Sequence, residues 1–162
     1  MKCCDKLKEL LDGNNIKYMT LAHSKAYTAQ EAAAAMHVSG TELAKSIIVR
    51  DNGRFSMVVL PASYQINFDM LKEALGKNTI QLATEKNFKT LFPEGCEVGA
   101  MCPFGNLYDI PVFLAQSIAD HDEIIFKAGS HSHAVRMMMN NYRDLVNPEL
   151  LKISEPAWPK RN

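Results

Sequence analysis

The sequence lacks long hydrophobic runs, and this absence excludes a membrane-spanning protein. No apolar segment in the 162 residues reaches the roughly 18 to 20 residues that a helix needs to cross a bilayer. The N-terminal residues MKCCD also lack the hydrophobic stretch of a secretion signal. We therefore expect a cytoplasmic protein with no membrane partner.

The sequence has no net charge, because 18 basic and 18 acidic side chains cancel. A protein that follows a long nucleic acid usually carries a basic face, since each neutralised phosphate contributes separately to affinity. The balanced charge therefore predicts no extended nucleic-acid groove. It is compatible with an enzyme that holds only a terminal nucleotide through a few local phosphate contacts.

Cysteines are few and are not spaced as a metal or disulfide framework. Cys3 and Cys4 form a vicinal pair, whereas Cys96 and Cys102 are isolated. This pattern contains neither a CxxC metal knuckle nor the regular spacing of a disulfide-rich domain. Free thiols are expected, and the pair at the terminus is assigned no function.

Three common signature motifs are also missing: a Walker loop, a GxGxxG after a strand, and a G-x-S-x-G elbow. Nucleotide hydrolysis, dinucleotide binding and the usual serine hydrolase chemistry therefore gain no support. The 47% apolar and 22% charged content is that of an ordinary globular protein. We predict one domain over residues 1–150, followed by a C-terminal tail over residues 151–162.

Helices are predicted where good helix formers or apolar residues at helical spacing lie beside capping residues. Thr28 and Glu31 form a T-x-x-E capping box, and Asn67 and Gly76 lie where an N-cap and a C-terminal glycine belong. The predicted segments are 4–11, ended by Gly13; 28–36; 68–75; a turn from Thr84 to Leu91, broken by Pro93 and Gly95; and a last helix capped by Asn140 or Asn141 and ended before Pro148.

Strands are predicted from short β-branched or alternating runs, and one turn is strongly indicated. Asp51-Asn52-Gly53 favours a type I′ hairpin, which places Lys45 at the start of a core strand. The predicted strands are 16–21, 46–49, 55–60, 80–83, 111–115, 123–128 and 134–139. About six or seven strands with four helices between them predict an α+β fold, with a mixed, partly open barrel-like sheet.

Lys45 and His131 are candidates for chemistry, each with a simpler alternative. A lysine at a strand end usually reaches solvent, because lysine is rarely buried without a partner. His131 follows Gly129 and Ser130 at the end of a strand, where an imidazole can orient a substrate or sit in solvent. His131 and His133 form an H-x-H pair, but without a third ligand this is weak evidence for zinc.

Cys102 and the methionine run at residues 137–139 have plain structural interpretations. A thiolate at Cys102 would need a base such as His131 to act as a nucleophile. The residue has no recognised catalytic signature around it, so a small packing residue is the better interpretation. The three methionines are expected to fill the core, with alternate members facing opposite sides.

Several of these signals occur in an order typical of one family. They are Thr28 with Glu31-Ala32-Ala33, Lys45-Ser46-Ile47-Ile48, Gly99-Ala100-Met101-Cys102-Pro103-Phe104-Gly105, and Ala128-Gly129-Ser130-His131. Together they resemble the YbaK-like aminoacyl-tRNA deacylases, a family similar to the editing domain inserted in bacterial prolyl-tRNA synthetases. The resemblance covers roughly residues 21–146, nearly the whole chain.

The resemblance implies a site and an activity. Lys45 matches the family's essential lysine, Gly99 and Pro103 match its G-x-x-x-P loop, and His131 matches a histidine found in some branches. The implied reaction is hydrolysis of the ester at the 3′-terminal adenosine of tRNA, without metal or cofactor. The implied partners are the tRNA acceptor end and, as a second candidate, an aminoacyl-tRNA synthetase. The implied substrate-binding residues are Ser46, Ala100, Met101, Cys102, Pro103, Gly129 and Ser130.

The resemblance leaves the substrate open. Some branches carry asparagine or threonine where this chain has Ser46, a position that helps to shape the amino-acid pocket. Alanyl, cysteinyl, seryl and threonyl esters all remain candidates, with tRNA(Pro) as the first tRNA to test, because a methyl or hydroxyl difference is discriminated by only about 1 to 3 kcal/mol. The alternative function is a non-catalytic tRNA- or synthetase-binding module with the same fold.

Overall fold

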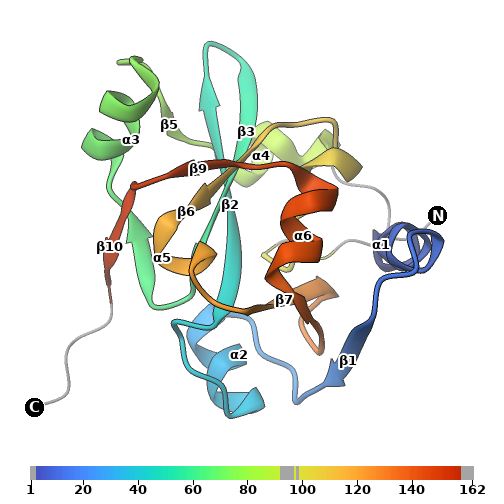
Figure 1. Ribbon diagram of the computed structural model, residues 1–162. Helices are drawn as coiled ribbons and strands as arrows, with labels where there is room; N and C mark the ends of the chain where they lie inside the picture. The colour runs from blue at the N-terminus through green and yellow to red at the C-terminus, as the bar shows by residue number, and fades with distance from the viewer. Residues whose placement is uncertain (1–2, 92–96, 98, 158–162) are drawn as a thin grey trace, which may run out of the picture.

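The computed structural model describes residues 3–91, 97 and 99–157. The predicted helix breakers Pro93 and Gly95, the cysteine Cys96 and the end of the tail from Trp158 lie outside the described residues. The described chain forms one large mixed sheet surrounded by helices, with a small second sheet beside it (Figure 1).

Six α-helices and ten strands are present in the described residues. The helices are α1 Cys3–Gly13, α2 Ala29–Met36, α3 Phe68–Leu75, α4 Glu85–Phe88, α5 Gln116–Ala119 and α6 Met139–Val146. The strands are β1 Tyr18–Ala22, β2 Leu43–Asp51, β3 Arg54–Pro61, β4 Tyr64–Ile66, β5 Gln81–Leu82, β6 Val112–Ala115, β7 Glu123–Ser130, β8 His133–Met138, β9 Glu149–Leu151 and β10 Ser154–Pro156.

The large sheet has the order β1-β8-β7-β2-β3-β6-β9, and β5 pairs with β2 off this path. The pairs β2–β7, β3–β6 and β6–β9 are parallel, and the others in this sheet are antiparallel. Strands β4 and β10 form the small antiparallel sheet. The predicted α+β class with a mixed, open sheet is confirmed.

The predicted hairpin is present between β2 and β3. Asp51 pairs with Arg54, and Asn52 and Gly53 have φ values of 49° and 80°. Positive φ at both central residues is the signature of a type I′ turn. The predicted placement of Lys45 near the start of a core strand is therefore confirmed, because it is the third residue of β2 and pairs with Leu60.

Capping explains where several helices begin and end. The Thr28 side-chain oxygen accepts the Glu31 N–H at 3.0 Å, while the Glu31 carboxylate accepts the N–H of Tyr27 instead of that of Thr28. Half of the predicted capping box is thus present at α2. Asn67 caps α3, and Gly76 ends it with φ 63°, as predicted.

Other boundaries differ from the predictions. The N-cap of α6 is Met138, with no side-chain cap hydrogen bond, because β8 runs directly into this helix; the predicted caps Asn140 and Asn141 lie inside it. Strands β4, β9 and β10 were not predicted. Each is only three residues long, too short to show a hydrophobic period. Strands β9 and β10 nevertheless bring part of the predicted tail into the fold, and Ile153 between them is fully buried.

The core lies on both faces of the large sheet. On one face, Ala44 of β2 and Phe126 of β7 join the largest cluster, which also contains α1 and α6 side chains. On the other face, Leu43 and Ile125 pack with α2. Further along that face of β2, Val49 joins a cluster with α3.

The methionine run follows the predicted alternation. Met137 and Met139 are buried, whereas Met138 is 46% exposed. Two of the three side chains therefore fill the core as expected. Among the helices that the structure describes, none combines the length and apolar character needed to cross a membrane.

Candidate functional site

The parallel pairing of β2 with β7 brings two lysines to neighbouring positions. Ala44 pairs with Phe126, and the next residue along each strand is Lys45 or Lys127. Side chains alternate between the faces of a strand, so both lysines share the face on which α2 packs. The candidate site is built at this point of the sheet.

Lys45 is half-buried and retains hydrogen-bonding capacity. Its ammonium Nζ donates to the carbonyl oxygen of Ala62 at 3.2 Å, which is its one side-chain hydrogen bond within the described residues. Since an ammonium has three N–H bonds, two have no partner among the described residues. Burial lowers the pKa of Lys45, because a low-dielectric environment disfavours the charged form.

Lys127 is buried more deeply, at 7% exposed. Its Nζ lies 3.0 Å from the carbonyl oxygen of Ala26, 3.5 Å from that of Tyr27 and 3.3 Å from Nδ1 of His131. Burial lowers the pKa of Lys127, and the negative charges of Glu31 and Glu97 oppose this shift. The sequence analysis missed this residue, although a lysine inside the apolar run 124–128 was a usable signal.

His131 is packed against Lys127 and the glycine loop. Its backbone N–H donates to Oε2 of Glu97 at 2.6 Å, and its ring Nε2 lies 3.9 Å from the same oxygen. The Tyr27 ring is 4.9 Å away between centroids. A Cβ placed on Gly99 would lie 3.6 Å from Cε1 of His131. The structure therefore brings together the predicted residues His131 and Gly99.

Backbone hydrogen bonds hold three distant segments against one another around His131. The Glu97 N–H donates to the Gly129 oxygen at 2.9 Å, and the Gly129 N–H donates to the Ala100 oxygen at 2.8 Å. The Ala26 N–H donates to the His131 oxygen at 2.9 Å. Gly99 and Gly129 have φ values of 81° and 88°, a region that glycine adopts without steric cost.

The remainder of the predicted G-x-x-x-P loop is directed into the core. Ala100, Met101, Cys102 and Pro103 are all buried. Sγ of Cys102 lies 3.5 Å from the Tyr108 hydroxyl, and the Tyr142 hydroxyl donates to the Pro103 oxygen at 2.7 Å. These side chains support the loop from within, and their contact with a substrate stays a prediction. Cys102 is fully buried, which does not favour a nucleophile.

Ser46 lies on the other face of β2 from Lys45. It stands between Ala44 and Ile48, which both belong to the largest core cluster. Its hydroxyl oxygen is buried and has no hydrogen-bond partner in the described part of the chain. The predicted influence of Ser46 on an amino-acid pocket next to Lys45 would therefore act through the strand and not by direct contact on the lysine face.

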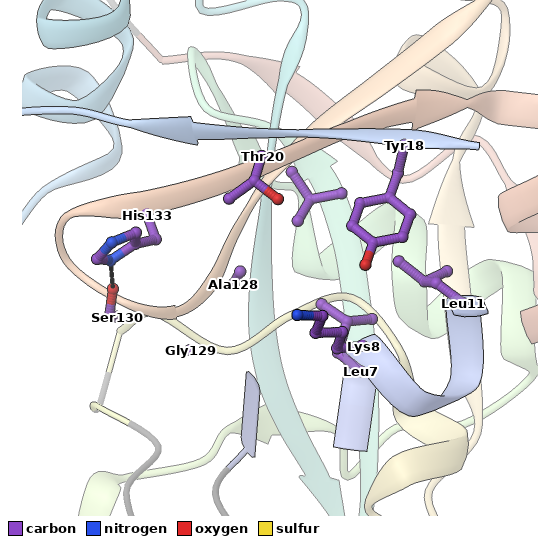
Figure 2. A pocket seen from close by; sticks show the side chains of 10 residues that line it. Leu7, Lys8, Leu11, Tyr18, Thr20, Ala128, Gly129, Ser130 and His133 are labelled. Carbon is purple, nitrogen blue, oxygen red and sulfur yellow. Dashed lines mark hydrogen bonds between the residues drawn. The ribbon is translucent and has the colours of Figure 1, made fainter. Parts of the chain in front are cut away.

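Gly129 and Ser130, also predicted to bind substrate, line a separate pocket of about 440 Å³. This pocket lies between α1 and strands β1, β7 and β8 (Figure 2). Ser130 Oγ is 3.0 Å from Nδ1 of His133 there. The full lining is Leu7, Lys8, Leu11, Tyr18, Thr20, Ala128, Gly129, Ser130, His133 and Val135.

The pocket and the lysine site lie on opposite faces of β7. Ala128 and Val135 belong to the largest core cluster, whereas Lys127 points to the α2 face. His131 and His133 accordingly have different partners, Lys127 for the first and Ser130 with Ser132 for the second. In residues 3–91, 97 and 99–157, no group of three His, Cys, Asp or Glu side chains is arranged to hold a metal ion.

Comparison with known proteins identifies the family. The family model of the aminoacyl-tRNA editing domain matches residues 23–145, a span that contains Lys45, Gly99, Lys127 and His131. The chain belongs to this family. The predicted resemblance to editing domains is thereby confirmed at the level of the family.

Three relatives place this editing domain among similar proteins. The proline–tRNA ligase of Bacillus mycoides is 26% identical over 92 residues, which cover 57% of this chain and 15% of the ligase. The chain thus spans a small part of that relative. A crystal structure of a hypothetical protein matches with a TM-score of 0.81 and 24% identity, over 93% of this chain and 99% of the other. A candidate trans-editing enzyme for prolyl-tRNA synthetase matches with a TM-score of 0.78 and 17% identity, over 96% and 98%.

Proposed function

We propose that this editing domain hydrolyses the ester bond of mischarged aminoacyl-tRNA, in trans and without a metal ion. The observation that carries the proposal is the half-buried Lys45 ammonium, which keeps two N–H bonds after its contact with Ala62. Its neighbour on the same face, Lys127, contacts His131, and His131 lies against Gly99. A cation, an imidazole and a glycine turn thus surround one place on the sheet.

This set of groups suits ester hydrolysis through charge stabilisation. A water oxygen attacks the ester carbonyl carbon, and the carbonyl oxygen becomes negative. The bond between that carbon and the ribose oxygen then breaks, and the ribose oxygen takes up the proton that the water loses, so that the free amino acid and a ribose hydroxyl are released. Lys45 stabilises the developing negative charge. Such electrostatic stabilisation is often the largest contribution to catalysis of this kind. His131 orients the ester or the ribose. The free hydroxyl of the same ribose is well placed to direct the attacking water.

Relatives guide the choice of substrate. The similarity to proline–tRNA ligases supports tRNA(Pro) as the first tRNA to test, and the domain would act in the cytoplasm on the 3′-terminal adenosine. Alanyl, cysteinyl, seryl and threonyl esters form the test panel, because pockets separate such small groups weakly unless dedicated hydrogen bonds exist. A synthetase is the second partner to test.

The deciding experiment measures deacylation of mischarged tRNA(Pro) and of other mischarged tRNAs by the unchanged protein and by Lys45→Ala. We expect at least one ester to be hydrolysed faster than its spontaneous rate, and Lys45→Ala to lose this activity. Treatment with a chelator should leave the rate unchanged. If no ester is hydrolysed while tRNA still binds, the chain is the non-catalytic module instead.

A further inference from the structure

Lys127 is a buried cation that the proposed reaction does not yet use. It stands inside the apolar strand β7, between Phe126 and Ala128, and is 7% exposed. Burying an ammonium costs free energy unless hydrogen bonds compensate for the lost water. No carboxylate in the described residues lies within ion-pair distance of the Lys127 ammonium. Its hydrogen bonds must therefore compensate for the cost of its burial.

Those contacts match the three N–H bonds of an ammonium. Two acceptors are the carbonyl oxygens of Ala26 and Tyr27, at 3.0 and 3.5 Å, in the segment that leads into α2. The third is Nδ1 of His131, at 3.3 Å. An uncharged amine could satisfy the same three atoms only if Nδ1 carried the proton and donated it. Burial lowers the pKa of Lys127, and the negative charges of Glu31 and Glu97 oppose this shift. Three neighbouring atoms that can each accept one of the three N–H bonds favour the ammonium form, which makes Nδ1 the acceptor.

We propose that Lys127 is a positioning residue that holds His131 as the neutral tautomer with its proton on Nε2, a role that rests on the proposed function. A neutral imidazole carries one proton, so a ring that accepts at Nδ1 must donate at Nε2. Protonation of Nδ1 would place an N–H against the Lys127 ammonium. His131 therefore acts as a hydrogen-bond donor and not as a base.

The surroundings of the ring leave its donor available to a substrate. Nε2 is 3.9 Å from Oε2 of Glu97, which is too long for a hydrogen bond, and that oxygen already accepts the backbone N–H of His131 at 2.6 Å. The Tyr27 ring packs against the imidazole, and Gly99 lies beside Cε1. His131 is 8% exposed, and Nε2 has no partner at hydrogen-bond distance among the described residues, so its proton is left for an ester or ribose oxygen that enters the site.

The charged and titratable groups around this ring come from three secondary-structure elements and two loops. Lys127 belongs to β7, Lys45 lies beside it on β2, Glu31 is on α2, and Glu97 precedes the Gly99 turn. Tyr27 covers the ring from the segment before α2. Of these, Lys127 is the one in contact with a ring nitrogen at hydrogen-bond distance, so it is the group that sets the tautomer.

The direct test is nitrogen NMR of the imidazole in the intact protein. Long-range proton–nitrogen correlations separate the two tautomers and the imidazolium, and His131→Gln assigns the His131 signals among the five histidines. At neutral pH we expect a protonated Nε2 and an unprotonated Nδ1. A proton on Nδ1, or an imidazolium, would overturn the proposal. This measurement needs no substrate, and its one variant serves only to assign the signals.

Variants then separate positioning from support of the fold. Lys127→Met should give a mixture of tautomers, whereas Lys127→Arg, which keeps a donor, should restore part of the Nε2–H signal. The matched control is Lys25→Met, because Lys25 is an exposed cation that lies 5.3 Å from the Tyr27 ring centroid and forms no hydrogen bond with His131. It should leave the tautomer unchanged.

Kinetics on the hydrolysed ester complete the test. We expect Lys127→Met to lower kcat by about ten- to a hundredfold with a smaller change in KM, since the donor at Nε2 is needed when charge develops. Lys127→Arg should recover part of kcat. An active Lys127→Met with unchanged kcat and unchanged tautomer would overturn the proposal. Absence of any hydrolysis by the unchanged protein would instead refute the proposed function and leave the NMR result standing.

Discussion

The two faces of β7 differ in what they offer a ligand. On the pocket face, Ala128 and Ser130 line a hollow of about 440 Å³ whose walls are largely apolar. On the α2 face, Lys127 and His131 meet in a tight cluster beside Lys45. The hollow has space but few charged groups, whereas the cluster has a buried and a half-buried cation and an imidazole. The candidate site is therefore assigned from the arrangement of polar groups and not from the size of a cavity.

The largest expected effect is a loss of stability without a loss of activity, caused by a substitution on the pocket face. Leu11 is fully buried and lines the pocket, so Leu11→Ala should lower the free energy of unfolding by about 2 to 5 kcal/mol, as large-to-small core changes do. Urea unfolding measures this loss. Well below the melting transition, kcat should stay at the level of the unchanged protein. A large loss of kcat in the folded variant would show that the pocket face takes part in catalysis.

The next effect concerns the lysine face. Lys45→Ala should reduce the deacylation rate by about 100- to 1000-fold, the usual cost of removing one stabilising donor from a developing negative charge, while far-UV circular dichroism stays unchanged. The matched control is Lys8→Ala on the pocket face, which should retain the full rate. Equal losses in both variants would erase the distinction between the faces.

A smaller effect is expected at the Gly99 turn beside His131. Gly99 and Gly53 have φ values of 81° and 80°, so alanine at either position should cost about 1 to 2 kcal/mol of unfolding free energy. Only Gly99→Ala should also lower activity, by about tenfold or more, because small displacements at a site are costly. Similar activity in the two variants would mean that the Gly99 turn does not position the reacting groups.

The smallest effect is a change in how stability depends on pH. The folded-state pKa values of Lys45 and Lys127 lie below the ordinary lysine value of 10.5, so the unfolded chain binds more protons just below that pH. Stability contributed by these groups should therefore rise with pH in that window, by at most about 1.4 kcal/mol per unit for each group.

Urea unfolding at about pH 8 and about pH 10 would measure this rise. Lys45→Met and Lys127→Met should each show a smaller rise than the unchanged protein, whereas Lys8→Met should match it. A steeper rise in either of the first two variants would contradict the direction of the pKa shifts. Because each comparison is between variants, the titration of other groups cancels.

The sequence predicted those parts of the fold that local chemistry determines. The Asn52-Gly53 turn, the Thr28 and Asn67 caps and the buried strand after Lys45 all follow from short-range rules, and the structure has them. The cap of α6 was predicted wrongly, because an asparagine next to a helix resembles a cap whether or not a strand already leads into the first turn. Strands of three residues gave no period to detect.

The site was predictable only in part, for a related reason. Lys45, Gly99 and His131 were identified by family resemblance, and the structure shows that Gly99 lies beside the His131 ring. Lys127 was missed, because its place beside Lys45 depends on the pairing of β7 with β2. Its hydrogen bonds go to carbonyl oxygens that are far away in the sequence. Strand alternation could have placed Ser46 away from Lys45 from the sequence alone.

The parallel pairing of β2 with β7 also has a consequence for how the protein acquires its activity. The Lys127 contact with Ala26 joins residues that are 101 positions apart, so no short fragment of the chain contains the cluster. Such long loops must close before the contact can form, which slows folding. Editing activity should therefore appear late during refolding, after the hairpin of β2 and β3, and should report on completion of the native topology.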